Sequence, residues 1–448
     1  MKKILLILVL FASSSLLQAQ INLKATVYPK DKFPWSILYE LKDVKQMYVD
    51  NKQQNKDSLF EFDMSGNKPG MYLLMYDMDK QNFVYFIYNQ KPVELEIYPT
   101  ENNRVKVIRS KENQVFLPYI EQKSSLVSKL KKLEKDLAQN KLTDEKKAEF
   151  KRLKKELDQL QKEYEKKSKD LLAHTYIVNS KEYFPDLKEN ADAYFTDKKA
   201  HYFDYLDFNN KDLQRSNIII NKINTYVFDI NPPTNPENKN VEYLKRIEDV
   251  LPRIKDSLYR NNVIFSLTTS FVYVDGRVSK MLIEKYIKKM PESEQKKIDL
   301  KGILDEIGLT IGEKAPDFSF LDLLEKKHSL YKITAEKPYT LLIFWSATCP
   351  HCLHAMPKIQ KMLKDRPDFK VVAIGLESEK YPWSSEHQYY PEFVHGLKLQ
   401  KWENPIVKTY HIKATPTFFI LNDKNEIIAE PYEVENIKEF LESHPVKK

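Results

Sequence analysis

Two cysteines, Cys349 and Cys352, are the only ones among the 448 residues of this chain, and two positions separate them. The apolar run at residues 341–345 predicts a buried parallel strand, and residues 350–363 predict the helix that follows it. A C-x-x-C at such a strand-to-helix turn is typical of a redox site. The helix N-terminus favours a thiolate on Cys349, and Cys352, one turn further on, can close on it as a disulfide. We therefore predict that both cysteines are catalytic and form a redox-active pair.

The same cysteines do not fit a zinc or haem site. A structural zinc ion usually takes four ligands from two separated pairs, and this sequence adds only His351 and His354 to its single cysteine pair. A c-type haem needs C-x-x-C-H, whereas Leu353 follows Cys352. The sequence thus predicts a site that needs no metal and no organic cofactor.

The first 19 residues have the pattern of a secretory signal peptide. Lys2 and Lys3 are basic, residues 4–12 are apolar, and Ala19 is a small residue at a plausible cleavage point. The apolar run is shorter than the roughly 20 residues that cross a bilayer, and no later stretch is long and apolar enough to do so. We expect an exported mature chain with no membrane span, in a compartment that permits disulfides.

The length and the charge of the chain bear on its domain number and on its possible binding partners. A chain of 448 residues predicts about three domains. Its formal net charge of +8 is mild for this size and is spread over many lysine and glutamate residues. Because no basic aromatic patch or nucleic-acid motif accompanies this charge, the sequence argues against nucleic-acid binding.

Residues 20–110 predict a small β-sandwich. Alternating apolar runs occupy residues 71–76, 83–88 and 93–98, and turns rich in Gly, Pro, Asn and Asp separate them. Short antiparallel strands at this spacing favour two packed sheets. The region contains no catalytic constellation, and its many aromatic residues are expected in the core.

Residues 111–308 predict an all-α region, and its most regular part is a long, coiled-coil-like helical hairpin near residues 120–172. Apolar residues recur there at spacings of three and four in an otherwise charged sequence: Leu126, Leu130, Leu133, Leu137, Phe150, Leu153, Leu157, Leu160 and Tyr164. Thr143 suits the N-cap of the second helix. The simplest structure is a projecting pair of antiparallel helices that acts as a spacer. The alternative is an arm for partner binding or self-association.

Residues 309–448 alternate strands with helices and predict an α/β domain. Three motifs follow one another there: Ala315-Pro316-Asp317-Phe318, then Phe344-Trp345 with the two cysteines, then Thr415-Pro416-Thr417 before a strand. In these motifs the chain resembles the thioredoxin superfamily, and within it the exported TlpA/ResA-like thiol-disulfide oxidoreductases. The upstream regions are loosely similar to accessory domains that are often fused to this class in envelope proteins of two-membrane bacteria.

The resemblance implies a role for each matching residue. Cys349 would be the nucleophile that attacks a disulfide, and Cys352 would be the resolving thiol that releases the mixed disulfide. Pro416 would follow a cis bond opposite the thiols, with Thr415 offering backbone groups to a bound substrate strand. Trp345 would pack under the active-site loop. The substrates would be protein thiols or disulfides, and an unidentified redox partner would act in the periplasm or cell envelope of a bacterium.

Two departures from the family pattern leave the redox direction open. Thioredoxins carry a buried acid where this chain has Ile343, and ResA-like proteins carry a glutamate where it has Ala355. Deprotonation of Cys352 must therefore rely on water or another group. Pro350-His351 matches the dipeptide of the strongly oxidising DsbA-type proteins, and an imidazolium there would stabilise the nucleophilic thiolate and hence the reduced form. Pro350 and His351 are thus tuning residues that do not decide between reductase, oxidase and isomerase.

Two other functions compete with this interpretation. The Ala-Pro-Asp-Phe motif also occurs in peroxiredoxins, but Leu342 and Ser346 replace the Pro and Thr of their reactive-cysteine pattern, so peroxidase activity is not expected. The second alternative is an envelope binding or scaffold protein. Its upstream domains would bind a partner, and its thiols would have a secondary or regulatory role.

Overall fold

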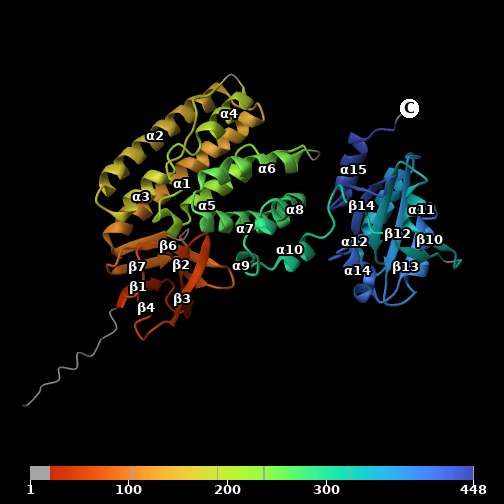
Figure 1. Ribbon diagram of the computed structural model, residues 1–448, viewed down its shortest axis with the longest axis horizontal. Helices are drawn as coiled ribbons and strands as arrows, with labels where there is room; N and C mark the ends of the chain where they lie inside the picture. The colour runs from red at the N-terminus through yellow and green to blue at the C-terminus, as the bar shows by residue number, and fades with distance from the viewer. Residues whose placement is uncertain (1–20, 102–103, 189, 236–237, 323, 447–448) are drawn as a thin grey trace, which may run out of the picture. The chain divides into compact units, whose positions relative to one another are not determined.

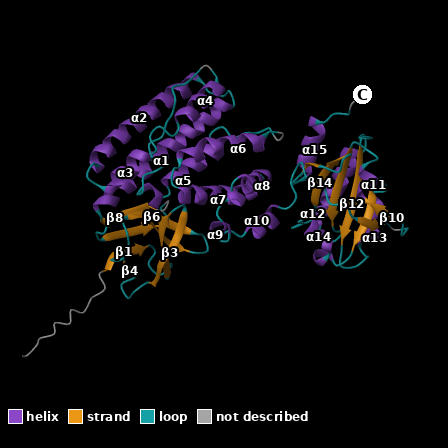
Figure 2. Ribbon diagram, in the orientation of Figure 1, coloured by secondary structure: helices purple, strands orange, loops and turns teal. Residues whose placement is uncertain are grey.

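The computed structural model describes residues 21–101, 104–188, 190–235, 238–322 and 324–446. The predicted signal peptide, residues 1–19, lies outside the described residues. The chain divides into two compact units, the first ending at Ser266 and the second beginning at Leu267. Strands come first, helices follow, and an α/β region closes the chain (Figures 1 and 2). The multidomain architecture predicted from the sequence is confirmed in this order of elements.

The first unit begins with two four-stranded sheets of order β4-β1-β7-β8 and β3-β2-β5-β6. Leu23 and Phe62 of the first sheet share one buried core with Leu74 and Phe86 of the second, which confirms the predicted sandwich. One pairing differs from the expected antiparallel pattern, because β1 and β7 run parallel. The strands are β1 (Ile21–Val27), β2 (Trp35–Lys42), β3 (Lys45–Gln53), β4 (Phe60–Asp63), β5 (Gly70–Asp77), β6 (Asn82–Tyr88), β7 (Val93–Tyr98) and β8 (Arg104–Arg109).

The predicted helical hairpin consists of α1 (Lys111–Ala138) and α2 (Asp144–Ser168), which run side by side in Figure 1. Ser110 and Thr143 accept hydrogen bonds from backbone N–H groups of the first turns and so act as N-caps. The hairpin does not project as expected. Phe150 of α2 packs edge-on against Phe184 and Tyr194, so later parts of the same unit cover the apolar seam. Association through this hairpin with a partner or a second copy stays an untested prediction.

Further helices complete the first unit. They are α3 (Leu172–Asn179), α4 (Ala191–His201), α5 (Ile218–Asn224) and α6 (Lys239–Val250), with short turns η1 (Leu213–Arg215), η2 (Thr225–Asp229) and η3 (Leu251–Arg253). Asn113 of α1 joins the helices to the sandwich, since its amide accepts from the N–H of Ile87 at 2.7 Å and donates to the carbonyl of Ile87 at 2.8 Å. These bonds satisfy backbone groups of the edge strand β6. Helix α7 (Ser257–Val274) contains the boundary between the units.

The second unit starts with α8 (Gly276–Lys285), η4 (Ile287–Lys289), α9 (Glu292–Gln295) and α10 (Leu300–Ile307) and continues into a five-stranded sheet of order β13-β12-β11-β14-β15. The strands are β11 (Tyr339–Trp345), β12 (Phe369–Leu376), β13 (Val394–Lys398), β14 (Thr417–Asn422) and β15 (Ile427–Ala429), preceded by the hairpin β9 (Ser319–Leu321) and β10 (Lys327–Ser329). Its remaining helices are α11 (Leu330–Thr334), α12 (Pro350–Leu363), α13 (Trp383–Glu386), η5 (His387–Tyr389), η6 (Lys401–Glu403), α14 (Pro405–Thr409) and α15 (Val434–Ser443).

Both faces of this sheet are covered. Alternate residues of β11 enter two cores: Ile343 and Trp345 pack with α12 and α15, whereas Leu342 and Phe344 pack with α11 and α14. A central strand buried on both sides explains why β11 is an unbroken apolar run. Strand β11 pairs in parallel with β12 and antiparallel with β14. This is the α/β thioredoxin-like arrangement expected for residues 309–448. Among the helices that the structure describes, none combines the length and the apolar character that crossing a bilayer requires.

Candidate active site

The two cysteines lie where the central strand β11 passes into helix α12. Strand β11 ends at Trp345, and α12 begins at Pro350, so Cys349 is the N-cap residue with an extended backbone conformation. Pro350 occupies the first helical position, where its missing N–H has no cost. Cys349 thus faces the unpaired N–H groups of the first helical turn, and these groups stabilise a negative charge.

The two thiols have very different environments. Both are free; Cys349 is partly exposed, and Cys352 is completely buried in the core beneath the loop. The Cys349 thiol donates a hydrogen bond to the carbonyl oxygen of Thr415, with 3.2 Å between Sγ and O. The Thr415–Pro416 peptide bond is cis. The loop before β14, 66 residues further along the chain, is therefore in direct contact with the first cysteine.

Burial and hydrogen bonding move the pKa values of the two thiols in opposite directions. Partial burial opposes ionisation of Cys349. Hydrogen bonds from the thiol and backbone N–H of Cys352, from the Thr415 side chain and from the N–H of His351 outweigh this effect and lower its pKa. Burial raises the pKa of Cys352 to about 12. At neutral pH the outer sulfur is therefore the better nucleophile, and the inner one is a protonated donor.

The remaining residues proposed for the site lie around this pair. Pro350 and His351 are exposed on the first turn of α12. Trp345 is fully buried in the same core as Cys352, and its ring meets Tyr390 edge-on, with 6.3 Å between ring centroids. The tuning role predicted for Pro350 and His351 and the supporting role predicted for Trp345 stay predictions.

A buried carboxylate that the sequence analysis did not single out lies under the active-site loop. Glu377 directly follows β12 and is 2% exposed. One carboxylate oxygen accepts from the hydroxyl of Ser346 at 3.0 Å, and the other accepts from the backbone N–H of Ala347 at 2.5 Å. The Ser346 hydroxyl also hydrogen-bonds to the hydroxyl of Thr348 and accepts from the backbone N–H of Thr348. Lys401 donates to the Thr348 hydroxyl at 3.2 Å. Glu377 thus anchors the segment that leads into Cys349.

The positions of Ile343 and Ala355 are apolar and buried, as the sequence predicts. Glu377, the residue after β12, instead supplies the buried carboxylate beside the active-site loop. A signal for it exists in the sequence, because an acid directly follows the largely apolar strand β12. Within the described part of the chain, no group of three or more His, Cys, Asp or Glu residues is arranged to hold a metal ion.

The fold and the paired thiols define a thioredoxin-like domain of the kind that thiol-disulfide oxidoreductases contain. Comparison with known proteins agrees, since residues 310–444 match the Redoxin family. The similarity to known proteins therefore lies in the C-terminal domain, which has a thioredoxin-like fold and matches the Redoxin family.

Individual relatives are similar in the same region. The thioredoxin-like protein YneN of Bacillus subtilis is 29% identical over 123 residues, which are 27% of this chain and 71% of YneN. Sporulation thiol-disulfide oxidoreductase A of the same bacterium is 30% identical over 113 residues, or 23% of this chain and 66% of that protein. Among solved structures, a thioredoxin-like protein from Bacteroides caccae is 18% identical, with a TM-score of 0.35, and the match covers 59% of this chain and 99% of that one.

Proposed function

We propose that this protein is an exported thiol-disulfide oxidoreductase that exchanges disulfides with protein substrates through Cys349 and Cys352. The observation that carries the proposal is the asymmetry of the pair. The pKa of the partly exposed Cys349 is lowered, and the pKa of the buried Cys352 is raised to about 12. Stepwise disulfide exchange requires a reachable nucleophile whose ionisation is favoured, beside a resolving thiol that is protonated and buried.

In the reducing direction the reaction proceeds in two exchanges. The Cys349 thiolate attacks one sulfur of the substrate disulfide, the substrate S–S bond breaks, and one substrate thiolate leaves. Cys352 then loses its proton and attacks Sγ of Cys349, which forms the Cys349–Cys352 disulfide and releases the second substrate thiolate. Two electrons pass from the pair to the substrate, and two protons complete its thiols. The oxidising direction reverses these steps.

Thr415 and Pro416 are the proposed substrate-binding residues. The carbonyl of Thr415 contacts the Cys349 thiol, so a disulfide sulfur that approaches Cys349 also approaches this backbone. An extended substrate segment can pair with the main chain there, as in strand addition to an exposed edge. Such pairing orients the substrate sulfur towards Cys349 without depending on the substrate sequence, which suits a protein that acts on several disulfides.

The redox direction depends on two opposed influences. Exposed His351, when protonated, would stabilise the neighbouring Cys349 thiolate and thus make the pair more oxidising. The buried Glu377 carboxylate would disfavour a second negative charge nearby. The reaction in the cell depends further on the envelope partner that recharges the pair.

The decisive experiment is trapping of native substrates. A Cys352→Ser variant keeps the nucleophile but cannot resolve the mixed disulfide, so it should accumulate covalent adducts that reductant dissolves. The matched Cys349→Ser variant should trap none and should fail to reduce insulin disulfides. If the Cys349→Ser variant retained insulin reduction, the proposed role of this residue would be wrong.

Export has its own test, because the predicted cleavage after Ala19 changes the mass of the protein. Protein recovered from the envelope fraction of a bacterial host should begin at Gln20 by intact mass. A full-length mass in the cytosolic fraction would contradict the proposed export while leaving the redox chemistry untouched.

A further inference from the structure

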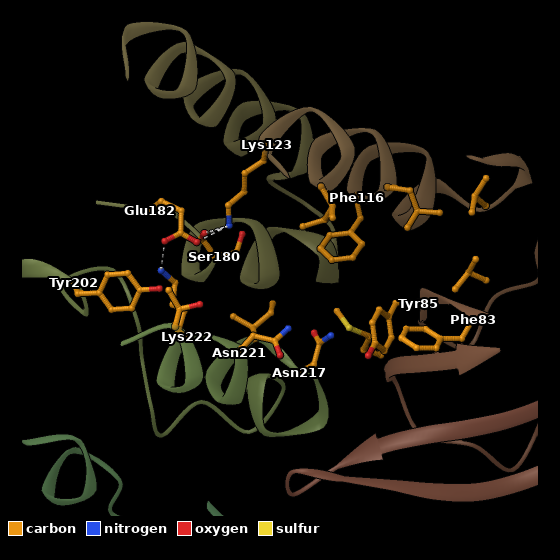
Figure 3. A pocket seen from close by; sticks show the side chains of 17 residues that line it. Phe83, Tyr85, Phe116, Lys123, Ser180, Glu182, Tyr202, Asn217, Asn221 and Lys222 are labelled. Atoms are coloured by element: carbon orange, nitrogen blue, oxygen red, sulfur yellow. Dashed lines mark hydrogen bonds and ion pairs between the residues drawn. The ribbon is translucent and has the colours of Figure 1, made fainter. Parts of the chain in front are cut away.

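The first unit contains a second site, remote in sequence from the cysteines: a pocket of about 390 Å³ between the sandwich, α1 and α5. Its volume lies at the lower end of the range of about 300–1,000 Å³ that is usual for small-molecule sites. Figure 3 shows the charged side chains Lys123, Glu182 and Lys222 together with Tyr202 at one end. The side chains of Phe116, Tyr85 and Phe83 lie towards the other end. Such sorting is a property of sites for amphipathic molecules.

The apolar end is built from strands β5 and β6 and from α1. Met71, Val84 and Phe116 line it and are themselves at least nine-tenths buried, while Leu117 and Phe83 are more exposed. These side chains present carbon and sulfur atoms to the pocket. Each methylene group that a ligand buries here leaves water for apolar surroundings, which favours binding. This end therefore suits an aliphatic chain.

The other end holds two lysines around one carboxylate. Glu182 lies 3.3 Å from Nζ of Lys123 and 3.4 Å from Nζ of Lys222, and the three side chains are 17%, 12% and 5% exposed. Lys123 also donates to the carbonyl of Ser180, the C-cap residue of α3, and Lys222 donates to the carbonyl of Lys181 at 2.7 Å. The trio carries a net charge of +1.

This surplus charge is poorly solvated. Burial lowers the pKa of Lys222 to about 8 despite its contact with Glu182. For Glu182, burial opposes ionisation, but Lys222 and Lys123 together lower its pKa to about 2. The carboxylate is thus firmly ionised and neutralises only one of the two lysines. The Lys222 ammonium also lies 4.8 Å from the centroid of the Tyr202 ring, which carries no negative charge of its own. Nearby Lys198 is balanced by its own partner Glu134. An anion at this end would offset the cost of the buried ammonium groups.

The lysines also retain hydrogen-bonding capacity. An ammonium group has three N–H donors, and the bonds to a carbonyl and to Glu182 use two of them on each lysine. Asn221 and Asn217 of α5 and its N-terminal flank extend towards the middle of the pocket in Figure 3. Asn217 bonds to the hydroxyl of Tyr85, so the amide of Asn221 is the one that can bind the second oxygen of a carboxylate.

We propose that this pocket binds a small amphipathic carboxylate, with its head group at Lys123 and Lys222 and its aliphatic chain along Met71, Val84 and Phe116. The site is separate from the thiol chemistry, and it gives the accessory region a binding function of its own. A medium-chain fatty acid has the required single negative charge and unbranched tail.

The test is calorimetric titration of the purified full-length protein with submicellar decanoate. Decanol, which has the same tail without the charge, and acetate, which has the charge without the tail, are the matched controls. We expect decanoate to bind at one site at least tenfold more tightly than decanol, and acetate to give no measurable heat. Equal binding of decanoate and decanol, equal binding of acetate, or no decanoate binding at all would each overturn the proposal.

Variants locate the binding. Lys123→Gln should weaken decanoate binding at least tenfold, whereas Lys123→Arg, which keeps the charge, should stay within a few-fold of the unchanged protein. Lys147→Gln, at an exposed lysine of α2 paired with Asp144, is the surface control and should have no effect. Leu117→Glu places a carboxylate in the apolar end and should abolish binding. If Lys123→Gln does not fold, Leu117→Glu still tests whether decanoate binds in this pocket. Unchanged affinity in Leu117→Glu would place the decanoate elsewhere and refute the assignment.

Discussion

Glu377 accepts a hydrogen bond from the backbone N–H of Ala347, with 2.5 Å between Oε1 and N. Its second oxygen accepts from the hydroxyl of Ser346 at 3.0 Å. Since Ala347 lies two residues before Cys349, the buried carboxylate that directly follows β12 holds the backbone that enters the redox site. Contacts with the residue after β12 therefore stabilise the conformation of this loop, in addition to the start of helix α12.

The first prediction concerns this carboxylate. Glu377→Ala leaves a buried N–H and a buried hydroxyl without their acceptor, and each unsatisfied group costs about 1–3 kcal/mol. We expect the free energy of unfolding to fall by about 2–5 kcal/mol in urea titrations of the second unit. Glu377→Gln keeps one acceptor oxygen, so its free energy of unfolding should fall by less. A Glu377→Ala variant as stable as the unchanged protein would refute the anchoring role.

The second prediction concerns the pH at which the thiols react. Cys349, with its lowered pKa, should be alkylated by iodoacetamide at neutral pH with a midpoint below the ordinary value for a thiol. Cys352, whose pKa is raised to about 12, should stay unmodified in the folded protein. Mass spectrometry after timed quenching should therefore count one modified thiol. Cys352→Ala removes a donor to the Cys349 sulfur, so it should shift the alkylation midpoint upward. Two thiols that react at equal rates would contradict the proposed asymmetry.

The strand and the helix that hold the cysteines were predictable because their signals are local. The apolar run before the site matches β11 (Tyr339–Trp345), and the predicted helix matches α12 (Pro350–Leu363). A strand buried on both faces needs no alternation of polar residues, and a proline at the first helical position is a defined start signal. The fold class of this domain followed from three short motifs in a fixed order.

Glu377 was not predicted because its contacts depend on strand register. Residues 345 and 375 are paired in the parallel ladder of β11 and β12, which brings the residue after β12 under the loop after β11. Nothing within either segment specifies this pairing. The prediction that the helical hairpin projects was wrong for a related reason. The apolar seam of α2 correctly predicts a helix with one buried face. It does not specify that Phe184 and Tyr194, which lie further along the chain, pack on Phe150.

The third prediction uses the acid sensitivity of Glu182. Its pKa is about 2 in the folded protein against an ordinary value of 4.5, so the carboxylate stabilises the folded state at every pH above about 4.5. That stabilisation, on the order of a few kcal/mol, is lost as the pH falls towards 2. Glu182→Gln should therefore be less stable than the unchanged protein at pH 7 and should show a flatter stability curve below pH 4.5. Glu163→Gln, at an exposed ion pair, is the control and should leave the curve unchanged. A parallel loss in all three proteins would contradict this role for Glu182.

The last prediction concerns the buried ion pair of Lys198 and Glu134, whose side chains are 4% and 8% exposed. Glu134 also accepts from the hydroxyl of Tyr194 at 2.7 Å, and the Lys198 ammonium lies 4.1 Å from the centroid of the Phe184 ring. Removal of one partner leaves an uncompensated buried charge, so Lys198→Met should destabilise the first unit by about 3–5 kcal/mol. The double variant Lys198→Met with Glu134→Leu removes both charges and should recover part of this loss. It will not recover all of it, because the Tyr194 hydroxyl then lacks its acceptor. Thermal unfolding of the single and double variants measures the coupling, and additive losses would show that the two charges do not stabilise one another.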